Sequence, residues 1–352
     1  MAASNIAQRF SVLLQTQASA NFAMVMSTGI VSIALHLLGY REAAHMLFAI
    51  NSLLFVLLVI LYPLRLLRYP RAFLADFTGH TTGPGFLTIV AGTCILGNQF
   101  VLLGDNVALA EGLFWVSVLL WIIILGGVFV CVFTCEPKPA LEHGINGAWL
   151  VATVSTQAIV ILGCILSPHM DWNKEAAFFC FIALFLLGFM LYLLVITMIF
   201  YRYCYKPLAP KDLSPTYWIN AGAVAITTLA GAELITHAHE STLALAFLPF
   251  IKGVTVLSFA TASFWIPLLF LLGIWRHVVR RYPFTYTAEY WGMVFPLGMY
   301  TACSVMLLKA LDLPFLMPLP EKFLLIAVLA WIVTFVGMCV ATTSALLHDK
   351  RA

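Results

Sequence analysis

Residues 290–304 have the sequence YWGMVFPLGMYTACS, which is apolar enough to lie in a membrane but is interrupted by Pro296, Gly292 and Gly298. Pro296 has no backbone N–H, so it leaves the carbonyl four residues earlier without its helical hydrogen bond. Phe295 stands directly before this break. Counted from Ala288, it lies about 10 Å along a helix, within the membrane. The segment is either a packing kink, which is common in membrane helices, or a gate formed by Phe295 and Pro296.

The composition around this segment indicates a membrane protein with many spans. The chain has 352 residues, of which 62% are hydrophobic and 9% are charged. A water-soluble domain carries about 25% charged residues, so this chain is suited to another solvent. Its formal net charge of +3 gives no indication of a nucleic-acid partner. The eight cysteines lie in or beside apolar spans with no C-x-x-C pair, which is typical of small apolar residues rather than a disulfide or metal framework.

Hydrophobic stretches of about 20 residues predict ten membrane-spanning helices. They lie near residues 21–38, 45–65, 82–103, 112–133, 145–166, 177–200, 216–236, 254–275, 288–308 and 323–346. With both termini in the cytoplasm, thirteen Lys and Arg residues fall on the cytoplasmic side and five on the other. This positive-inside bias predicts the orientation.

Basic, proline-containing loops recur along the chain. Their prolines Pro70, Pro139, Pro207 and Pro283 are 69, 68 and 76 residues apart, which indicates five repeats of a two-helix hairpin. The alternative is that proline and basic residues simply punctuate loops.

The two spans of each hairpin differ in composition. Gly, Ser, Thr, Asn and Gln make up 32 of 104 residues in the odd spans and 18 of 113 in the even spans. In lipid such residues belong at helix contacts or around a polar cavity. We therefore expect the five odd helices inside and the five even helices outside, facing lipid.

Several hydroxyls, amides and glycines of the odd spans are candidates for lining a pore, because such groups replace part of an anion's hydration shell without trapping it. Each hydroxyl and amide is also explained by a hydrogen bond between helices. The candidates are Ser27, Thr28, Gly29, Thr93, Thr153, Thr156, Gln157, Asn220, Thr227 and Gly298.

Glu233, His237 and His239 form a cluster near the outer end of the seventh span. Neutral histidine with carboxylate is able to bind a metal or to carry protons, although a solvated helix end accounts for the same residues. No nucleophile triad, H-E-x-x-H motif or phosphate loop is present, so the sequence predicts neither an enzyme nor a cofactor. A metal-dependent membrane enzyme using this cluster is the alternative from another class.

Four segments together resemble the tellurite-resistance/dicarboxylate transporter family, which includes plant slow-type anion channels, yeast malate permeases and sulfite efflux pumps. They are ANFAMVMSTGIVSIALHLL (20–38), WINAGAVAITTLAG (218–231), FWIPLLFLLGIWRH (264–277) and YWGMVFPLGMYTA (290–302). The resemblance runs from about residue 20 to 346. It implies an all-α membrane protein of five hairpins with pseudo-fivefold symmetry around a central pore, assembled as a homotrimer.

In the channels of this family a phenylalanine beside the kink of the ninth helix plugs the pore, and Phe295 is at the matching place. The resemblance thus implies a channel or transporter for small anions such as chloride, nitrate, sulfite or malate. A proton-coupled C4-dicarboxylate permease and a sulfite or tellurite efflux carrier remain alternatives. We expect residues 1–19 to form a cytoplasmic arm, 20–347 the pore domain in the inner or plasma membrane, and 348–352 a cytoplasmic tail.

Overall fold

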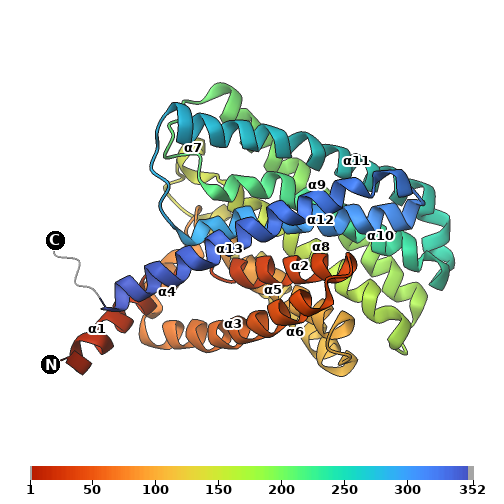
Figure 1. Ribbon diagram of the computed structural model, residues 1–352, viewed down its shortest axis with the longest axis horizontal. Coiled ribbons are helices and arrows are strands. Elements are labelled where there is room, and N and C mark those ends of the chain that lie inside the picture. Colours follow the sequence, from red (N-terminus) through yellow and green to blue (C-terminus); the bar gives the residue numbers. More distant parts are fainter. Residues whose placement is uncertain (1, 348–352) are drawn as a thin grey trace.

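A computed structural model describes residues 2–347 of the chain, with the side chains of residues 2–7 left undescribed. The described part is helical and contains no strand, so the predicted all-α class is confirmed (Figure 1). The predicted tail, 348–352, lies outside the described residues.

Five buried helices correspond to the odd spans of the sequence. Four of them start with a short 3-10 turn that continues directly into the α-helix, with these bounds: α2 (Ala23–Leu37), η1 (Gly83–Leu87) with α5 (Thr88–Leu102), η2 (Gly147–Leu150) with α8 (Val151–Leu166), η4 (Pro215–Trp218) with α10 (Ile219–His237), and η7 (Ala288–Tyr290) with α12 (Trp291–Leu311).

Five longer helices correspond to the even spans: α3 (Arg41–Arg68), α6 (Val107–Thr134), α9 (Lys174–Tyr205), α11 (Thr242–Ile274) and α13 (Pro318–Leu347). Three of them begin at a side chain that accepts a hydrogen bond from an otherwise free backbone N–H, namely Asn106, Asn173 and Ser241.

The inner and outer roles of the two sets follow the predicted odd–even contrast. In the most apolar window of each span, 78–94% of the residues are buried in the spans of α5, α8, α10 and α12, against 22–33% in those of the five long helices. In α2 thirteen of the fifteen residues are buried. Each inner helix contacts the next, and α12 contacts α2, so the five close into a ring. Each outer helix packs on its hairpin partner.

Nine of the ten predicted membrane spans correspond to long apolar helices in the described part of the chain. Nine helical segments are long and apolar enough to cross a membrane, whereas α2 has only 15 residues. Because α2 is enclosed by α3, α5, α12 and α13, it needs no lipid-facing length of its own. The count of ten therefore stays a prediction that depends on α2.

The eighth span is expected to start near residue 254, because Pro249, Lys252 and Gly253 suggest a later start than the apolar sequence, which begins near Leu243. That later start is wrong, because α11 begins at Thr242. Pro249, Lys252 and Gly253 lie on its exposed surface, where they do not interrupt the helix. After Ile274 a π-helical turn, η6 (Trp275–Val279), follows.

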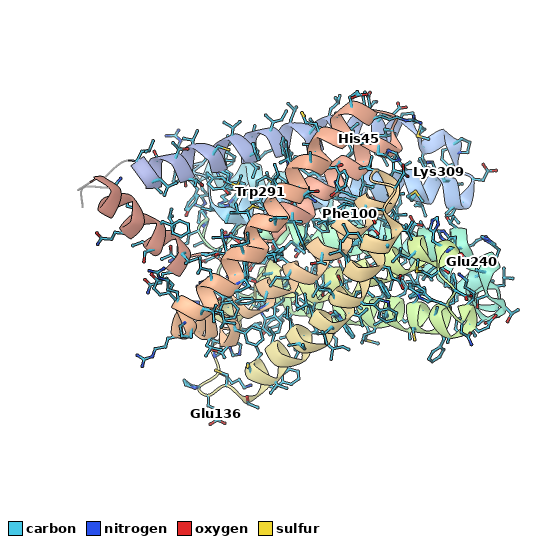
Figure 2. All side chains as sticks on the ribbon, turned by 90° about the horizontal axis from the view of Figure 1, so that it is seen from below. His45, Phe100, Glu136, Glu240, Trp291 and Lys309 are labelled. Carbon is cyan, nitrogen blue, oxygen red and sulfur yellow. The ribbon has the colours of Figure 1, made fainter. Side chains whose placement is uncertain are left out.

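Short elements complete the chain at the ends of the ring: α1 (Ala2–Gln15), α4 (Pro70–Thr78), α7 (Leu141–Gly144), η3 (Ser167–His169), η5 (Ala238–Glu240) and η8 (Pro314–Leu316). Figure 1 shows α1 beside the end of α13, and the Arg9 guanidinium donates to the Leu346 carbonyl oxygen over 3.1 Å. The first and last helices thus meet at one end of the bundle. Figure 2 shows His45, Glu240 and Lys309 at the opposite end.

Candidate functional site

A cavity of about 230 Å³ lies where the five inner helices begin, and we call it the first chamber. All five helices contribute to its wall in the same way, with two residues three positions apart in the first turns of each. The pairs are Ala23 and Met26, Gly85 and Thr88, Ala148 and Val151, Thr216 and Ile219, and Gly292 and Phe295.

The repeated geometry has an electrostatic consequence. The N-terminus of an α-helix carries a partial positive charge and free N–H groups. Five such ends surround the first chamber, which makes its wall favourable to negative charge. Two carboxylates, Asp76 and Glu289, also line the chamber and oppose this effect, and Asp76 is paired with Arg65 at 2.5 Å.

A second chamber of about 370 Å³ lies between the same five helices at their C-terminal halves. Its walls are mostly apolar, with Ile30, Ile95, Ala158, Ile226 and Met299 as the lining residues nearest to the first chamber. The charged or titratable side chains on its wall are His169, Glu233, His237 and Lys309.

The two chambers share no lining residue, so a septum of protein separates them. On α12 the septum is thin, because Phe295 lines the first chamber and Met299, one turn later, lines the second. The Phe295 ring is 1% exposed and lies against α10 at Gly222. A Cβ atom at Gly222 would be 3.2 Å from Phe295 Cε1 and 2.7 Å from Pro296 Cγ. The predicted pair, Phe295 and Pro296, therefore meets a glycine of α10 in the septum.

The predicted pore-lining residues lie elsewhere: all ten are within the described part of the chain, and none lines either chamber. Three of them bind outer helices. Thr28 Oγ1 accepts from Trp331 Nε1 of α13 and Thr156 Oγ1 from Trp121 Nε1 of α6, each over 2.9 Å. Gln157 Nε2 donates to the Phe185 carbonyl of α9, also over 2.9 Å.

Three further hydroxyls of this set donate to backbone carbonyls. Ser27 Oγ donates to the Trp291 carbonyl of α12 over 2.7 Å. Thr93 and Thr227 donate to carbonyls of their own helices, as isolated helix hydroxyls do.

The remaining four of the ten residues are also buried between helices. A Cβ at Gly29 would meet Asn51 and Ile95, and one at Gly298 would meet Ile30 and Val31. The Thr153 hydroxyl and the amide group of Asn220 are buried without a hydrogen-bond partner among the described residues.

Asn98 lines the second chamber but is not among the ten predicted pore-lining residues, because in the sequence it looks like any other amide of an inner helix. Its side chain is 3% exposed, and its Oδ1 has no protein partner in the described part of the chain. It lines the second chamber, where its polar group is available to a transported molecule or to water. The signal in the sequence is its helical spacing from Ile95 and Leu102, which becomes visible only when the axis-facing side of the helix is known.

The structure divides the predicted Glu233, His237 and His239 cluster. Glu233 Oε2 lies 3.6 Å from His237 Nδ1, and both residues line the second chamber. His239 is apart from them, with Nδ1 3.2 Å from the Thr236 carbonyl. Within residues 2–347, no three His, Cys, Asp or Glu side chains gather to hold a metal ion.

A ring of five helices with a narrow septum between two axial chambers is the architecture of a membrane channel or transporter. A family model described as voltage-dependent anion channel matches residues 18–339, so the chain belongs to that family. This confirms the resemblance found in the sequence.

Relatives agree with this assignment. An uncharacterized membrane protein of Mycobacterium tuberculosis is 38% identical over 148 residues, covering 42% of this chain and 75% of its own. Two uncharacterized transporters of Methanocaldococcus jannaschii are 23% and 24% identical over 295 residues, which is 82% of this chain and 84% and 82% of theirs. The family and these relatives support a general role in anion transport.

Proposed function

We propose that this protein moves small anions across the cell membrane along the axis of the helix ring, and that Phe295 is the gate. The observation that carries the proposal is the position of the Phe295 ring in the septum between two chambers built by the same five helices. Turning the ring away from Gly222 would join the chambers. Pro296 supports this motion, because it removes one helical hydrogen bond next to the gate.

Preference for anions has a physical basis in the first chamber. An anion entering it meets five helix N-termini, each with the equivalent of about half a positive charge. No lysine or arginine lines this chamber among the described residues, so the attraction comes from dipoles that do not hold the ion permanently. Chloride, nitrate, sulfite, tellurite and malate-like anions are all candidates.

The test is anion flux from liposomes that contain the purified protein. We expect Phe295→Ala to raise the flux at least tenfold, because the substitution removes the ring that closes the septum. Phe185→Ala is the matched control: Phe185 is also fully buried, but it lies on the outer helix α9 and lines neither chamber. Absence of anion flux in both wild type and Phe295→Ala, under every gradient, would overturn the proposal.

A proton-coupled C4-dicarboxylate permease is the second candidate function, and the second chamber is the observation that favours it. Glu233, His237, His169 and Lys309 share its wall. An anion entering there would be repelled by the Glu233 carboxylate and attracted by Lys309. Protonation of Glu233 removes the repulsion, so a proton and an anion would bind together.

For this candidate we expect malate uptake by wild type to rise as the pH falls, and uptake by Glu233→Gln to lose that dependence. Thr236→Val, on the same chamber wall but uncharged, is the control. An unchanged pH profile in Glu233→Gln would exclude Glu233 as the proton carrier.

We also propose that both termini are cytoplasmic and that the protein assembles as a homotrimer. The basic residues counted in the sequence support the orientation. The trimer rests on the resemblance to the family, and the mass of the detergent-solubilised complex by light scattering tests it.

A further inference from the structure

Two outer helices, and the turn that follows a third, carry a buried arginine near the end where the chain termini meet. Arg65 on α3, Arg202 on α9 and Arg276 after α11 are 2%, 6% and 9% exposed. Arg65 and Arg202 each lie five residues before a loop proline, Pro70 and Pro207. Arg276 lies seven residues before its loop proline, Pro283, and within the π-helical turn. The three arginines thus occupy corresponding positions in the hairpin repeat, except that Arg276 lies two residues farther from its loop proline than the other two.

The first two arginines are bonded by other protein groups, although Arg65 Nη1 and Arg202 Nε are buried without a partner among the described residues. Arg65 pairs with Asp76 and donates to the Gln15 carbonyl over 3.0 Å. Arg202 donates to the Ile145 carbonyl over 2.8 Å and to the Tyr217 hydroxyl.

Arg276 differs, because its guanidinium makes neither a hydrogen bond nor an ion pair with any residue in the described part of the chain. Its carbon Cζ lies over the Tyr282 ring, 4.5 Å from the ring centroid. Its Nε is buried without a partner. Glu289 is within electrostatic range but forms no ion pair with Arg276 among residues 2–347. A buried guanidinium with no hydrogen-bonded partner is costly, so an anion bound at its edge would lower the free energy of this site.

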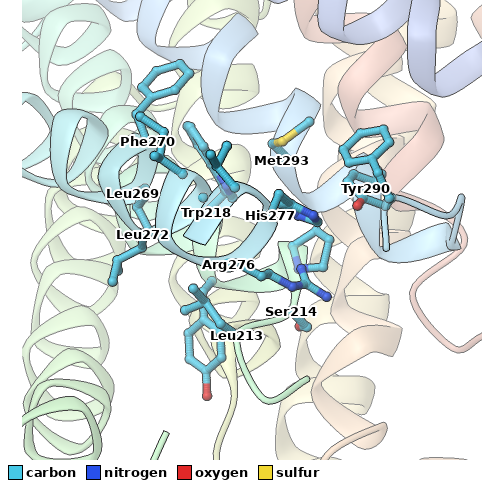
Figure 3. A pocket seen from close by; sticks show the side chains of 16 residues that line it. Leu213, Ser214, Trp218, Leu269, Phe270, Leu272, Arg276, His277, Tyr290 and Met293 are labelled. Carbon is cyan, nitrogen blue, oxygen red and sulfur yellow. The ribbon is translucent and has the colours of Figure 1, made fainter. Parts of the chain in front are cut away.

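Arg276 lines a pocket of about 290 Å³ whose other walls are mainly apolar. In Figure 3 the Arg276 side chain points toward Ser214, while Phe270 and Met293 lie on the far side of the pocket.

The pocket continues into a groove of about 510 Å³ between α11 and α13, with which it shares Trp218, Phe270, Phe284, Tyr290 and Met293. The floor of the groove includes Met293 and Leu297 of α12, and its rim includes the exposed Leu329 and Val333 of α13. Both rim helices are outer helices of the membrane domain. An apolar groove open to lipid therefore ends at a buried, unpaired guanidinium.

We propose that this groove binds one anionic membrane phospholipid, with its phosphate on Arg276 and an acyl chain along the α11–α13 groove. A guanidinium binds phosphate through two parallel N–H···O bonds, which suits the unbonded guanidinium of Arg276. The groove between α6 and α9 is a comparison within the same molecule. It has about 360 Å³ of mostly apolar wall, but no arginine among its lining residues in the described chain.

The test is lipid retention by the purified full-length protein in neutral detergent, measured by native mass spectrometry with phosphatidylglycerol and phosphatidylcholine of identical chains. We expect wild type to retain phosphatidylglycerol with roughly tenfold preference, and Arg276→Gln to lose that preference. Arg276→Lys, which keeps the charge without the planar fork, should retain part of it. Arg280→Gln, an exposed neighbour that does not line the pocket, should bind as wild type does.

A second arm tests the acyl chain. Ala330→Trp places a large side chain in the groove without changing charge and should reduce the occupancy of both lipids. Equal lipid preference in wild type and Arg276→Gln would overturn the proposal. Competition by inorganic phosphate as strong as that by the lipid would make this a soluble-anion site instead. A third outcome would also overturn the proposal: wild type retains no lipid, and Ala330→Trp breaks up its oligomer. A second copy of the chain would then cover the groove. These readouts need no anion flux, so they are independent of the proposed transport function.

Discussion

At Gly222 a hydrogen atom occupies the place where any other residue would have a side chain pressed against Phe295 and Pro296. A methyl group there would lie 2.7 Å from Pro296 Cγ and 3.2 Å from Phe295 Cε1. Because both neighbours are buried in a packed ring, we expect Gly222→Ala to destabilise the protein by about 1–3 kcal/mol. The melting temperature of the detergent-solubilised protein measures this effect.

Gly253→Ala is the control for that measurement. Gly253 lies on the outer helix α11, where an added methyl group would meet no neighbouring group within 4 Å, and alanine favours a helix over glycine. Its melting temperature should stay the same or rise. A Gly222→Ala variant as stable as Gly253→Ala would show that Phe295 does not rest on α10.

The polar residues show how far a sequence predicts a site in a membrane. A threonine on an inner helix has the same appearance whether it faces the axis or an outer helix. Thr28 and Thr156 face outer tryptophans, because an indole N–H in lipid needs an acceptor within the protein. Phe295 was different, since the proline and glycines around it set its position apart. Its role as a gate stays a prediction.

At the scale of elements, the same kind of hydrogen bond joins neighbouring hairpins at two places. Trp331 of α13 donates to Thr28 of α2, and Trp121 of α6 donates to Thr156 of α8. Replacing Trp331 by phenylalanine or Thr28 by valine should each lower the melting temperature. In a double-mutant cycle the pair should show a coupling energy of about 0.6 kcal/mol, and up to about 1.7 kcal/mol. Independent effects of the two substitutions would mean that the hydrogen bond contributes nothing to the packing of α13 on α2.

The helices themselves were largely predictable, because the cost of an unpaired backbone in lipid makes every long apolar stretch a helix. The odd–even contrast also predicted which helix lies inside in four of the five hairpins; it fails in the last, where residues 288–308 hold four Gly, Ser, Thr, Asn or Gln residues and 323–346 hold five. The start of α11 was not predictable in the same way: Pro249, Lys252 and Gly253 suggest a boundary, yet on the exposed side of a long outer helix each is tolerated. The 3-10 turns at the start of four inner helices were not predictable, because prolines and glycines are their only mark in the sequence.

At the scale of the whole molecule, the orientation of the ring decides which chamber an anion meets first. Lys211, in the loop before α10, and Asp171, in the loop before α9, are both exposed and belong to opposite ends of the helices. In intact cells we expect a membrane-impermeant maleimide to label Asp171→Cys in a cysteine-free background. Lys211→Cys should react only after the membrane is permeabilised. The reverse pattern would invert the proposed topology and put the first chamber outside.

If the Phe295 ring closes an anion path along the axis, the size of this side chain is the quantity to vary. The most direct measurement is the anion current through planar bilayers containing wild type, Phe295→Trp, Phe295→Leu or Phe295→Ala at one fixed voltage. We predict that the current rises as the side chain shrinks, in the order Trp, Phe, Leu and Ala. Equal currents in all four proteins would contradict a gate at this position, and would leave Phe295 as a packing residue of α12.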